Sequence, residues 1–239
     1  MSDAAMDGLR SDYLRLLERL EANEREFRRL GRAVWRVQED ERRRLARDLH
    51  DGIGQNLTAL KHRLAQLEGE LPPEHRGRVQ AAMALCHDTL EDTRQMSRLL
   101  RPPILDDLGL EPALRWLARS VGEAAGIEVE LEAGDLPTLD GDLQTLLFRV
   151  AQEALNNVAK HAQARRVLVR LVQRGPVLLL DVADDGRGFE PSPASGGSGL
   201  GGMRERVRLY GGKLELHSAA GEGTRLRVTV PLGSPFPAA

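Results

Sequence analysis

The feature that most constrains the fold of this sequence is a long stripe of apolar residues at helical spacing. From Tyr13 to about Leu67 the sequence is highly charged, and its only glycines are Gly31, Gly52 and Gly54. Such a pattern is typical of an amphipathic helix and predicts one long helix, or two joined ones, that needs a partner helix. The stripe consists of Ala46, Leu49, Ile53, Leu57, Leu60, Leu64 and Leu67, with Phe27, Leu30, Val34 and Val37 upstream.

Two proline pairs mark the ends of helices. Leu71-Pro72-Pro73 ends the first helix and Arg101-Pro102-Pro103 ends a second, because proline lacks the backbone N–H and restricts the residue before it. The sequence therefore predicts an αα-hairpin. Two hairpins would bury both stripes as a four-helix bundle, so we expect a homodimer. The second stripe consists of Val79, Met83, Cys86, Leu90 and Leu100, in which the lone cysteine is expected to be a core residue.

After Pro103 the pattern changes to alternating helical and strand periods, which indicates a second, mixed α/β domain. We expect a Pro/Ser/Gly-rich loop from Phe189 to Gly199 in this domain. The predicted helices cover residues 111–125, 141–161 and from the loop to 210, and the predicted strands cover 127–131, 166–173, 177–183, 213–217 and 224–231.

Composition excludes several classes of protein. The chain has 239 residues, 41% of them apolar, which is enough for a packed core in one large domain or two modest ones. Its net charge of −2 lacks the cationic surplus of a nucleic-acid binder, so no direct nucleic-acid partner is expected. No apolar run is long enough to span a membrane, and Asp3 and Asp7 stand where a signal peptide would be basic. A cytoplasmic protein is expected.

A His–Asp–Gln group on the first hairpin helix is suited to phosphoryl chemistry. At about 100° per residue, His50 lies at the edge of the apolar stripe, with Asp51 and Gln55 as neighbours on the water-facing side. A neutral imidazole can attack phosphorus while a carboxylate stabilises the developing positive charge, and a Gln can orient a water molecule. A histidine in a polar helix is often incidental, so this interpretation depends on the rest of the chain.

The helix expected at 141–161 separates core residues from chemically active ones. Glu153 and Asn157 share a face, with Lys160 nearby. A carboxylate, an amide and an ammonium group suit a Mg²⁺ ion held against nucleotide phosphates. The alternative is an ordinary solvated helix face.

Two glycine-rich segments flank the expected loop. Asp184-Asp185-Gly186-Arg187-Gly188 follows a strand, and Gly197-Ser198-Gly199-Leu200-Gly201 precedes a helix. Glycines permit close backbone approach to a nucleotide, and N–H groups at a helix start attract phosphate. Asp184 could accept a hydrogen bond from the adenine amino group. The late position of the glycines does not fit a Rossmann site, and the sequence lacks the Walker pattern, so a different ATP-binding fold is required.

Together these segments resemble the sensor histidine kinases, and within them the nitrate-sensor-like subfamily, over roughly Glu39 to Leu232. The resemblance implies a helical hairpin, which is a four-helix bundle in the dimer, followed by an ATP-binding α/β sandwich of the GHKL or Bergerat type. In that sandwich, helices cover one face of a mixed sheet. The motifs are Glu41–Asp51 for the phosphoacceptor box, Leu100–Leu110 for the interdomain link, Gln152–Asn157 for the N box, Asp184–Gly188 and Gly197–Gly201 for the glycine boxes, and Gly223-Thr224.

The resemblance also implies a role for each matched residue. His50 is the expected phosphoacceptor, Asp51 the base and Gln55 the phosphatase residue. Glu153 is expected near the reacting phosphate and Asn157 on Mg²⁺, and both are candidate metal ligands. The remaining residues expected to bind ATP are Lys160, Asp184, Gly186, Gly188, Gly197, Gly199, Leu200, Gly201 and Thr224.

The resemblance implies ATP-dependent phosphorylation of His50, transfer to an aspartate of a response regulator, and dephosphorylation of that partner. The regulator is expected to have a receiver domain and a helix-turn-helix output domain. We expect four segments: residues 1–38 as a helical or coiled-coil segment, 39–103 for dimerisation and phosphotransfer, 104–233 for ATP binding, and 234–239 as a tail.

Two departures from the family pattern and two rival functions stay open. Position 185 is Asp where these kinases more often have Asn, and the chain lacks a recognisable sensor region. The input comes either from a separate protein or from a sensor outside this sequence. The basic run 42–47 is either a solvated face or a phosphate or partner contact. The rival functions are another ATPase of this fold, in which His50 is incidental, and a non-enzymatic adaptor.

Overall fold

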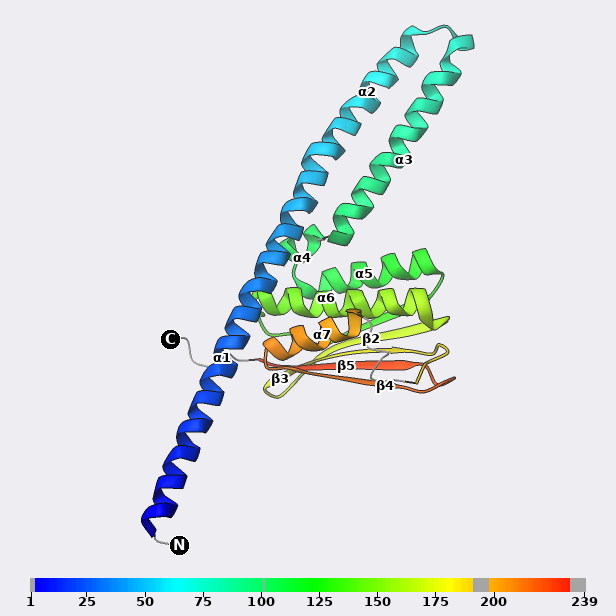
Figure 1. The fold of residues 1–239 in the computed structure, drawn as a ribbon. Helices are drawn as coiled ribbons and strands as arrows, with labels where there is room; N and C mark the ends of the chain where they lie inside the picture. The colour runs from blue at the N-terminus through cyan, green and yellow to red at the C-terminus, as the bar shows by residue number, and fades with distance from the viewer. Residues whose placement is uncertain (1–2, 101, 191–197, 233–239) are drawn as a thin grey trace. The chain divides into compact units, whose positions relative to one another are not determined.

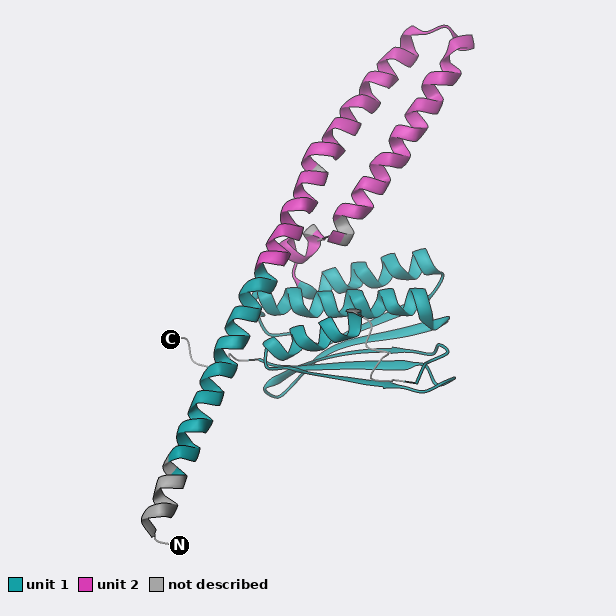
Figure 2. Ribbon diagram, viewed as in Figure 1, with its two compact units in different colours: residues 1–36, 110–239 teal, residues 37–109 magenta. Residues whose placement is uncertain are grey.

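The computed structural model describes residues 3–100, 102–190 and 198–232. The chain divides into two compact units, one formed by residues 37–109 and the other by residues 1–36 together with 110–239 (Figure 2). The long helix α1 (Asp3–Asp48) contributes residues to both units. The polypeptide therefore begins in unit 1, passes through unit 2, and returns to unit 1 at Leu110.

Residues 37–109 form the αα-hairpin that the proline pairs predict. After α1 come the π-helical segment η1 (Leu49–Gly54), α2 (Gln55–Glu70), the short turn η2 (Pro73–His75), α3 (Arg76–Leu100) and α4 (Pro103–Asp107). Pro72 has an extended backbone, with ψ at 148°, so the chain reverses direction there as expected. The predicted hairpin is confirmed.

Hydrogen bonds and a partly covered apolar stripe hold the two hairpin helices together. Ser97 Oγ donates to the Ala46 carbonyl at 2.9 Å, and Cys86 Sγ donates to the Leu57 carbonyl at 3.2 Å. Cys86 is 5% exposed, which confirms it as a core residue. Ile53 and Leu60 are each 47% exposed, so one hairpin leaves half of its stripe uncovered.

Two local features of the hairpin differ from the sequence prediction. Residues 49–54 are π-helical, so the spacing of 100° per residue used to place His50 does not hold there. The interdomain link expected at Leu100–Leu110 contains a short helix, α4, that the sequence pattern did not predict. Asp106 on α4 pairs with Arg43 at 3.1 Å, which ties the link to the hairpin.

Residues 110–232 of the unit drawn in teal in Figure 2 form an α/β sandwich (Figure 1). Its mixed sheet has the order β1-β2-β3-β5-β4, in which β1 and β2 are parallel and the other neighbours antiparallel. The helices α5, α6 and α7 cover one face of it. The strands are β1 (Glu128–Ala133), β2 (Arg166–Arg174), β3 (Val177–Asp184), β4 (Lys213–Ser218) and β5 (Thr224–Pro231), and the helices are α5 (Leu110–Ala125), α6 (Gly141–Asn157) with the π-helical η3 (Val158–Ala162), and α7 (Ser198–Leu209).

Alternation along the strands separates an apolar face from a charged one. Leu180 and Val182 of β3 are buried on the side of the helices. Asp181 between them is 4% exposed and accepts a hydrogen bond from Arg225 Nε at 2.9 Å on the other face. Burial alone would raise the pKa of Asp181, but the hydrogen bonds and charge of Arg225 outweigh it and lower that pKa.

A bilayer crossing needs about 20 mainly apolar residues in one helix. No helix within residues 3–100, 102–190 and 198–232 meets that requirement.

Candidate functional site

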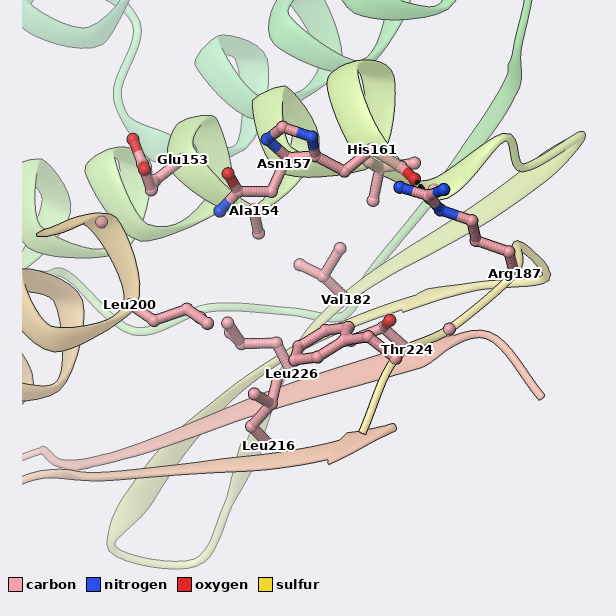
Figure 3. A pocket seen from close by; sticks show the side chains of 15 residues that line it. Glu153, Ala154, Asn157, His161, Val182, Arg187, Leu200, Leu216, Thr224 and Leu226 are labelled. Carbon is pink, nitrogen blue, oxygen red and sulfur yellow. Dashed lines mark hydrogen bonds between the residues drawn. The ribbon is translucent and has the colours of Figure 1, made fainter. Parts of the chain in front are cut away.

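A cavity of about 490 Å³ lies between α6 and the sheet of the α/β sandwich. Its size is within the range of small-molecule sites in proteins. Figure 3 shows side chains from α6, η3, α7 and the strands that surround it. The lining residues are Glu153, Ala154, Asn157, Val158, His161, Ala162, Val182, Arg187, Gly188, Phe189, Gly199, Leu200, Leu216, Thr224 and Leu226.

The wall formed by α6 is polar. The helix begins at a cap in which Asp140 Oδ1 accepts from the Leu143 backbone N–H at 2.7 Å. The opposite end of the helix presents Glu153 and Asn157 to the cavity, one turn apart as the sequence predicts (Figure 3). A carboxylate and an amide oxygen therefore face the same space.

The opposite wall is apolar. Val182 of β3, Leu216 of β4 and Leu226 of β5 point into the cavity, and Leu200 at the start of α7 lies at its edge (Figure 3). An apolar wall facing a polar one suits a ligand with a flat, weakly polar ring at one end and charged groups at the other. ATP is such a ligand.

Asp184 lies at the end of β3 beside this cavity, although it is not among its lining residues. Together with Thr224 it borders an adjoining hollow. Its Oδ1 accepts from the Gly186 backbone N–H at 2.9 Å. Burial raises the pKa of Asp184, against the lowering effect of hydrogen bonds from Gly186 and Thr224. The carboxylate is thus fixed in position but costly to keep ionised without a further donor.

Glycine is required where the backbone segment at 184–188 passes close to the segment at 219–223. Gly188 has φ +58° and Gly223 has φ +73°, which is the left-handed region. A Cβ at Gly188 would overlap the Ala219 carbonyl, and one at Gly223 would overlap the Asp184 carbonyl. Gly186 is also enclosed, by Ala162 and Asp184. These glycines shape the cavity wall by allowing the two backbones to approach each other.

Asp185, where the family more often has Asn, has a structural role. Its Oδ1 accepts from the backbone N–H groups of Arg165 at 2.8 Å and Arg166 at 2.9 Å. These hydrogen bonds lower the pKa of Asp185. An Asn carbonyl oxygen could accept the same bonds, so Asp is a conservative departure at this position.

The second glycine segment is only partly described. Gly197 lies outside the described residues, whereas Gly199 lines the cavity so closely that a Cβ there would overlap Glu153 Oε1. Gly201 faces open space. Lys160 is exposed and is not among the cavity-lining residues.

Sequence reasoning missed several cavity residues, notably His161, Arg187 and Phe189. Arg187 Nε donates to the His161 carbonyl at 2.7 Å, which holds its guanidinium at the cavity edge (Figure 3). Arg187 stands inside the first glycine segment, and that position was a usable signal. His161 was not foreseen because the last turn of this helix is π-helical.

The expected acceptor group lies in the hairpin unit. His50 and Asp51 belong to η1 and Gln55 begins α2; the His50 side chain lies outside the described part of the structure. Asp51 and Gln55 are exposed. Gln55 also borders a groove with Thr58, His62 and Arg94. A π-helical turn is frequent at functional sites, because it presents side chains at a spacing that a regular helix cannot provide.

Among the described residues, no group of three or more His, Cys, Asp or Glu side chains forms a ready-made metal site. Glu153 and Asn157 supply oxygen atoms of the kind that Mg²⁺ prefers, and Mg²⁺ commonly takes one or two protein ligands together with substrate phosphates. The residues present fit a metal ion that enters with a nucleotide.

Two family models match the chain. Residues 41–105 match the histidine kinase family, and residues 142–234 match the family of histidine kinase-, DNA gyrase B- and HSP90-like ATPases. The first range covers the hairpin and the second contains the cavity. The two matches occur in the order that the motifs predict.

Curated relatives extend this similarity across most of the chain. The sensor histidine kinase MctS of Rhizobium johnstonii is 37% identical over 211 residues, which cover 84% of this chain and 45% of MctS. The signal transduction histidine-protein kinase/phosphatase UhpB of Salmonella typhimurium is 38% identical over 208 residues, covering 85% of this chain and 41% of UhpB. The chain thus spans less than half the length of these relatives.

A solved structure supports the fold. The histidine kinase domain of the blue-light activated histidine kinase EL346 from Erythrobacter litoralis superposes with a TM-score of 0.51 at 21% identity, covering 74% of this chain and 94% of that domain. Its likeness shows a helical hairpin joined to an α/β ATPase domain. Motifs, family matches and relatives agree, and the chain belongs to the sensor histidine kinases of two-component systems.

Proposed function

We propose that this chain is an ATP-dependent protein histidine kinase that phosphorylates His50 and passes the phosphoryl group to an aspartate of a response regulator. The observation that carries the proposal is the cavity in which Glu153 and Asn157 face an apolar wall, with Asp184 beside it. Family membership of both the hairpin and the ATPase segment supports it.

In this proposal some residues in and beside the cavity bind the adenine end of ATP and others bind its phosphates. Asp184 accepts a hydrogen bond from the adenine amino group, and Thr224 lies beside it. Gly186, Gly188, Gly199, Leu200 and Gly201 let the backbone close around the nucleotide. Lys160, one helical turn beyond Asn157 but outside the cavity lining, is a proposed ATP-binding cation. Glu153 and Asn157 would hold Mg²⁺, which would neutralise phosphate charge when bound.

The transfer step is an in-line displacement. A ring nitrogen of His50 forms a bond to the γ-phosphorus while the bond between that phosphorus and ADP breaks. Asp51 stabilises the positive imidazole that results, and catalysis comes mainly from positioning and charge neutralisation. The phosphoryl group then moves from the His50 nitrogen to a carboxylate oxygen of the partner.

The partners follow from the same proposal. We expect a homodimer, since Ile53, Leu60 and Leu67 of a single hairpin remain about half exposed, at 47%, 47% and 45%. A response regulator with a receiver domain and a helix-turn-helix output domain is the proposed acceptor, and a separate sensor protein is a proposed input. We propose that the chain consists of four segments: a helical or coiled-coil segment (1–38), a dimerisation and phosphotransfer domain (39–103), an ATP-binding domain (104–233) and a tail (234–239).

Calorimetric titration of the purified chain with ATP tests the binding half of the proposal. We expect one Mg²⁺-dependent site per chain, and loss of binding when EDTA removes the metal. A chain that takes up no nucleotide in the presence of Mg²⁺ would refute the proposed function.

Gly199→Ala tests the position of Glu153. The added methyl group would overlap Glu153 Oε1, so the carboxylate must move away from the cavity. We expect the autophosphorylation rate to fall by about ten-fold or more, because a small displacement of a positioned group is costly. The matched control is Gly141→Ala at the start of α6, where a Cβ meets open space far from Glu153 along the helix, and the rate should be unchanged. Equal rates for both variants would contradict the role of Glu153.

Gln55→Ala tests the phosphatase role. Gln55 is exposed at the start of α2, so its truncation should not disturb the hairpin. We expect normal autophosphorylation but dephosphorylation of the partner slowed by about 100-fold, which is typical for loss of a group that positions the attacking water. Gln80→Ala on α3 is the control. Unchanged decay of the phosphorylated regulator would remove Gln55 from the mechanism.

A further inference from the structure

Three polar residues form a row across the end of the sheet, and we call Asp184, Thr224 and Ser218 the polar row. Thr224 of β5 is paired in register with Asp184 of β3 on one side and with Ser218 of β4 on the other. Residues two apart on a strand share a face, so the polar row continues the apolar wall of the cavity. The proposed function places Asp184 and Thr224 at the adenine end of ATP and gives Ser218 no role. The neighbouring row of the apolar wall consists of Val182, Leu226 and Leu216, in the same register.

The Ser218 hydroxyl joins three different segments. Its Oγ accepts from the Phe189 backbone N–H at 2.9 Å, donates to the Gly223 carbonyl at 2.9 Å and lies 3.1 Å from Thr224 Oγ1. A serine hydroxyl has one hydrogen to donate and two lone pairs with which to accept. Its hydrogen is used by Gly223, which leaves the Thr224 hydroxyl as the donor in the third contact. The hydrogen-bonding capacity of Ser218 is therefore fully used.

Phe189 is the cavity residue that this hydroxyl holds. Phe189 is among the lining residues of the cavity, whereas Ser218 is not and borders the adjoining hollow. A backbone N–H lies in the plane of its peptide group, so a bond to that N–H fixes the orientation of the peptide that carries the side chain. Ser218 can therefore influence a bound ligand through Phe189 without touching the ligand.

The residue two positions before Phe189 is held by contacts that do not involve Ser218. The Gly221 backbone N–H donates to the Arg187 carbonyl at 2.6 Å, and the Arg187 backbone N–H donates to the Ala162 carbonyl at 2.8 Å. Loss of the Ser218 hydroxyl should therefore leave Arg187 in place. The expected effect is confined to the Phe189 peptide.

The contacts of Ser218 lie away from the carboxylate assigned to the reacting phosphate. Figure 3 shows Thr224 and Arg187 at the end of the cavity away from Glu153. Ser218 contacts Thr224 and the peptide two positions after Arg187, so its contacts belong to that end. A residue that acts there should change how tightly the nucleotide binds, and should leave the transfer step from the bound nucleotide unchanged.

We propose that Ser218 is a positioning residue for ATP, whose hydroxyl fixes Phe189 against the ring end of the nucleotide. This inference rests on the proposed function, because it takes the cavity to be an ATP site. The physical reason is that a partly buried N–H without an acceptor is costly, so Phe189 leaves its position when the hydroxyl is removed. An aromatic side chain beside an apolar wall provides contact area for a flat ring.

The test compares four substitutions in the full chain. Ser218→Ala removes the hydroxyl, Ser218→Thr retains it, and Phe189→Ala removes the ring through which the hydroxyl is proposed to act. Thr229→Val is the matched control, because it removes a hydroxyl from β5 outside the cavity lining and preserves the shape of the side chain.

Calorimetric titration with Mg²⁺ and a non-hydrolysable ATP analogue measures nucleotide affinity. Ser218→Ala should weaken binding about five-fold or more, because one hydrogen bond is lost and its donor is left without a partner. Ser218→Thr and Thr229→Val should bind within about two-fold of the unmodified protein. In the Phe189→Ala background, Ser218→Ala should weaken binding by less than about two-fold further, because the ring is already absent.

Autophosphorylation kinetics separate binding from transfer. The KM for ATP should rise in Ser218→Ala by about the factor by which its affinity falls, and the rate at saturating ATP should stay within about two-fold of that of the unmodified protein. A lower rate at saturating ATP with an unchanged KM would assign Ser218 to the transfer step and overturn the proposal.

Hydrogen exchange at the Phe189 amide reports the bond itself. The chain has four phenylalanines, so ¹⁵N-phenylalanine labelling gives four amide signals, and Phe189→Ala identifies the signal of Phe189. This amide should be protected in the unmodified protein, in Ser218→Thr and in Thr229→Val. In Ser218→Ala it should exchange about ten-fold faster or more.

Rapid exchange of the Phe189 amide in the unmodified protein would show that the bond does not form and would overturn the proposal without any variant. Unchanged affinity in Ser218→Ala, although its Phe189 amide exchanges faster, would overturn it as well. So would an equal loss of affinity with and without the Phe189 ring, since Ser218 would then act through another residue. If the unmodified protein does not bind the analogue in the presence of Mg²⁺, the proposed function fails instead, so the two failures are distinguishable.

Discussion

Replacing His50 with Gln is expected to abolish phosphorylation of the chain while leaving Mg²⁺-dependent ATP binding unchanged. The amide of Gln can replace hydrogen bonds of an imidazole but cannot attack phosphorus. His50 lies in the hairpin unit and the cavity lies in the other unit, so the cavity should not sense the change. Incorporation of ³²P from γ-labelled ATP and calorimetric ATP titration measure the two properties separately.

A matched control for this variant is His62→Gln, which changes an exposed histidine of the same hairpin. It should incorporate label at the rate of the unmodified protein. Retention of label in His50→Gln, or its loss in His62→Gln, would contradict the assignment of the acceptor.

Asp184→Asn is expected to weaken ATP binding by about ten-fold or more, because a charge-assisted hydrogen bond becomes a neutral one. The same change should raise the melting temperature of the ligand-free protein at neutral pH. Burial raises the pKa of Asp184, so its ionised form costs stability once the pH is above that pKa. The gain from Asn should shrink as the pH falls below the raised pKa of Asp184 towards the ordinary value for Asp, because the carboxyl group becomes protonated in the folded chain.

Asp185→Asn is the control, since an Asn oxygen can still accept from the Arg165 and Arg166 backbones. Its ATP affinity should match that of the unmodified protein. Asp185 has a lowered pKa, so its replacement should not stabilise the protein. Calorimetry and thermal melts at pH 7 and pH 4 would measure both effects, and equal affinities for the two variants would contradict the adenine contact of Asp184.

The hairpin and the sheet could be predicted from sequence because their signals are local. Proline pairs fix where α2 and α3 end, and period-two alternation identifies strands such as β3 and β5. The Glu153–Asn157 pair was found for the same reason, since four-residue spacing on a regular helix places two side chains on one face.

The two π-helical turns could not be predicted in this way. η1 and η3 each depart from 100° per residue, at His50 and at His161. A π-helical turn is stabilised by its surroundings rather than by a local sequence pattern, so periodicity misses it. This is why His161 was not expected at the cavity and Lys160 was.

The contact between Trp35 and Tyr210 could not be predicted from the sequence either. Trp35 stands in a charged helix, and only packing against Tyr210, far along the chain, distinguishes it from a surface residue. A single aromatic residue outside the apolar stripe carries no periodic signal. Long-range pairs of this kind become visible only in three dimensions.

The central claim is that the terminal phosphoryl group of ATP reaches His50. The direct measurement is to incubate the purified chain with Mg²⁺ and ATP labelled in either the α or the γ position, and then map the labelled residue. We expect label from the γ position only, on His50, stable in alkali and lost in acid. Label that survives acid, or label on a serine or threonine, would contradict the account.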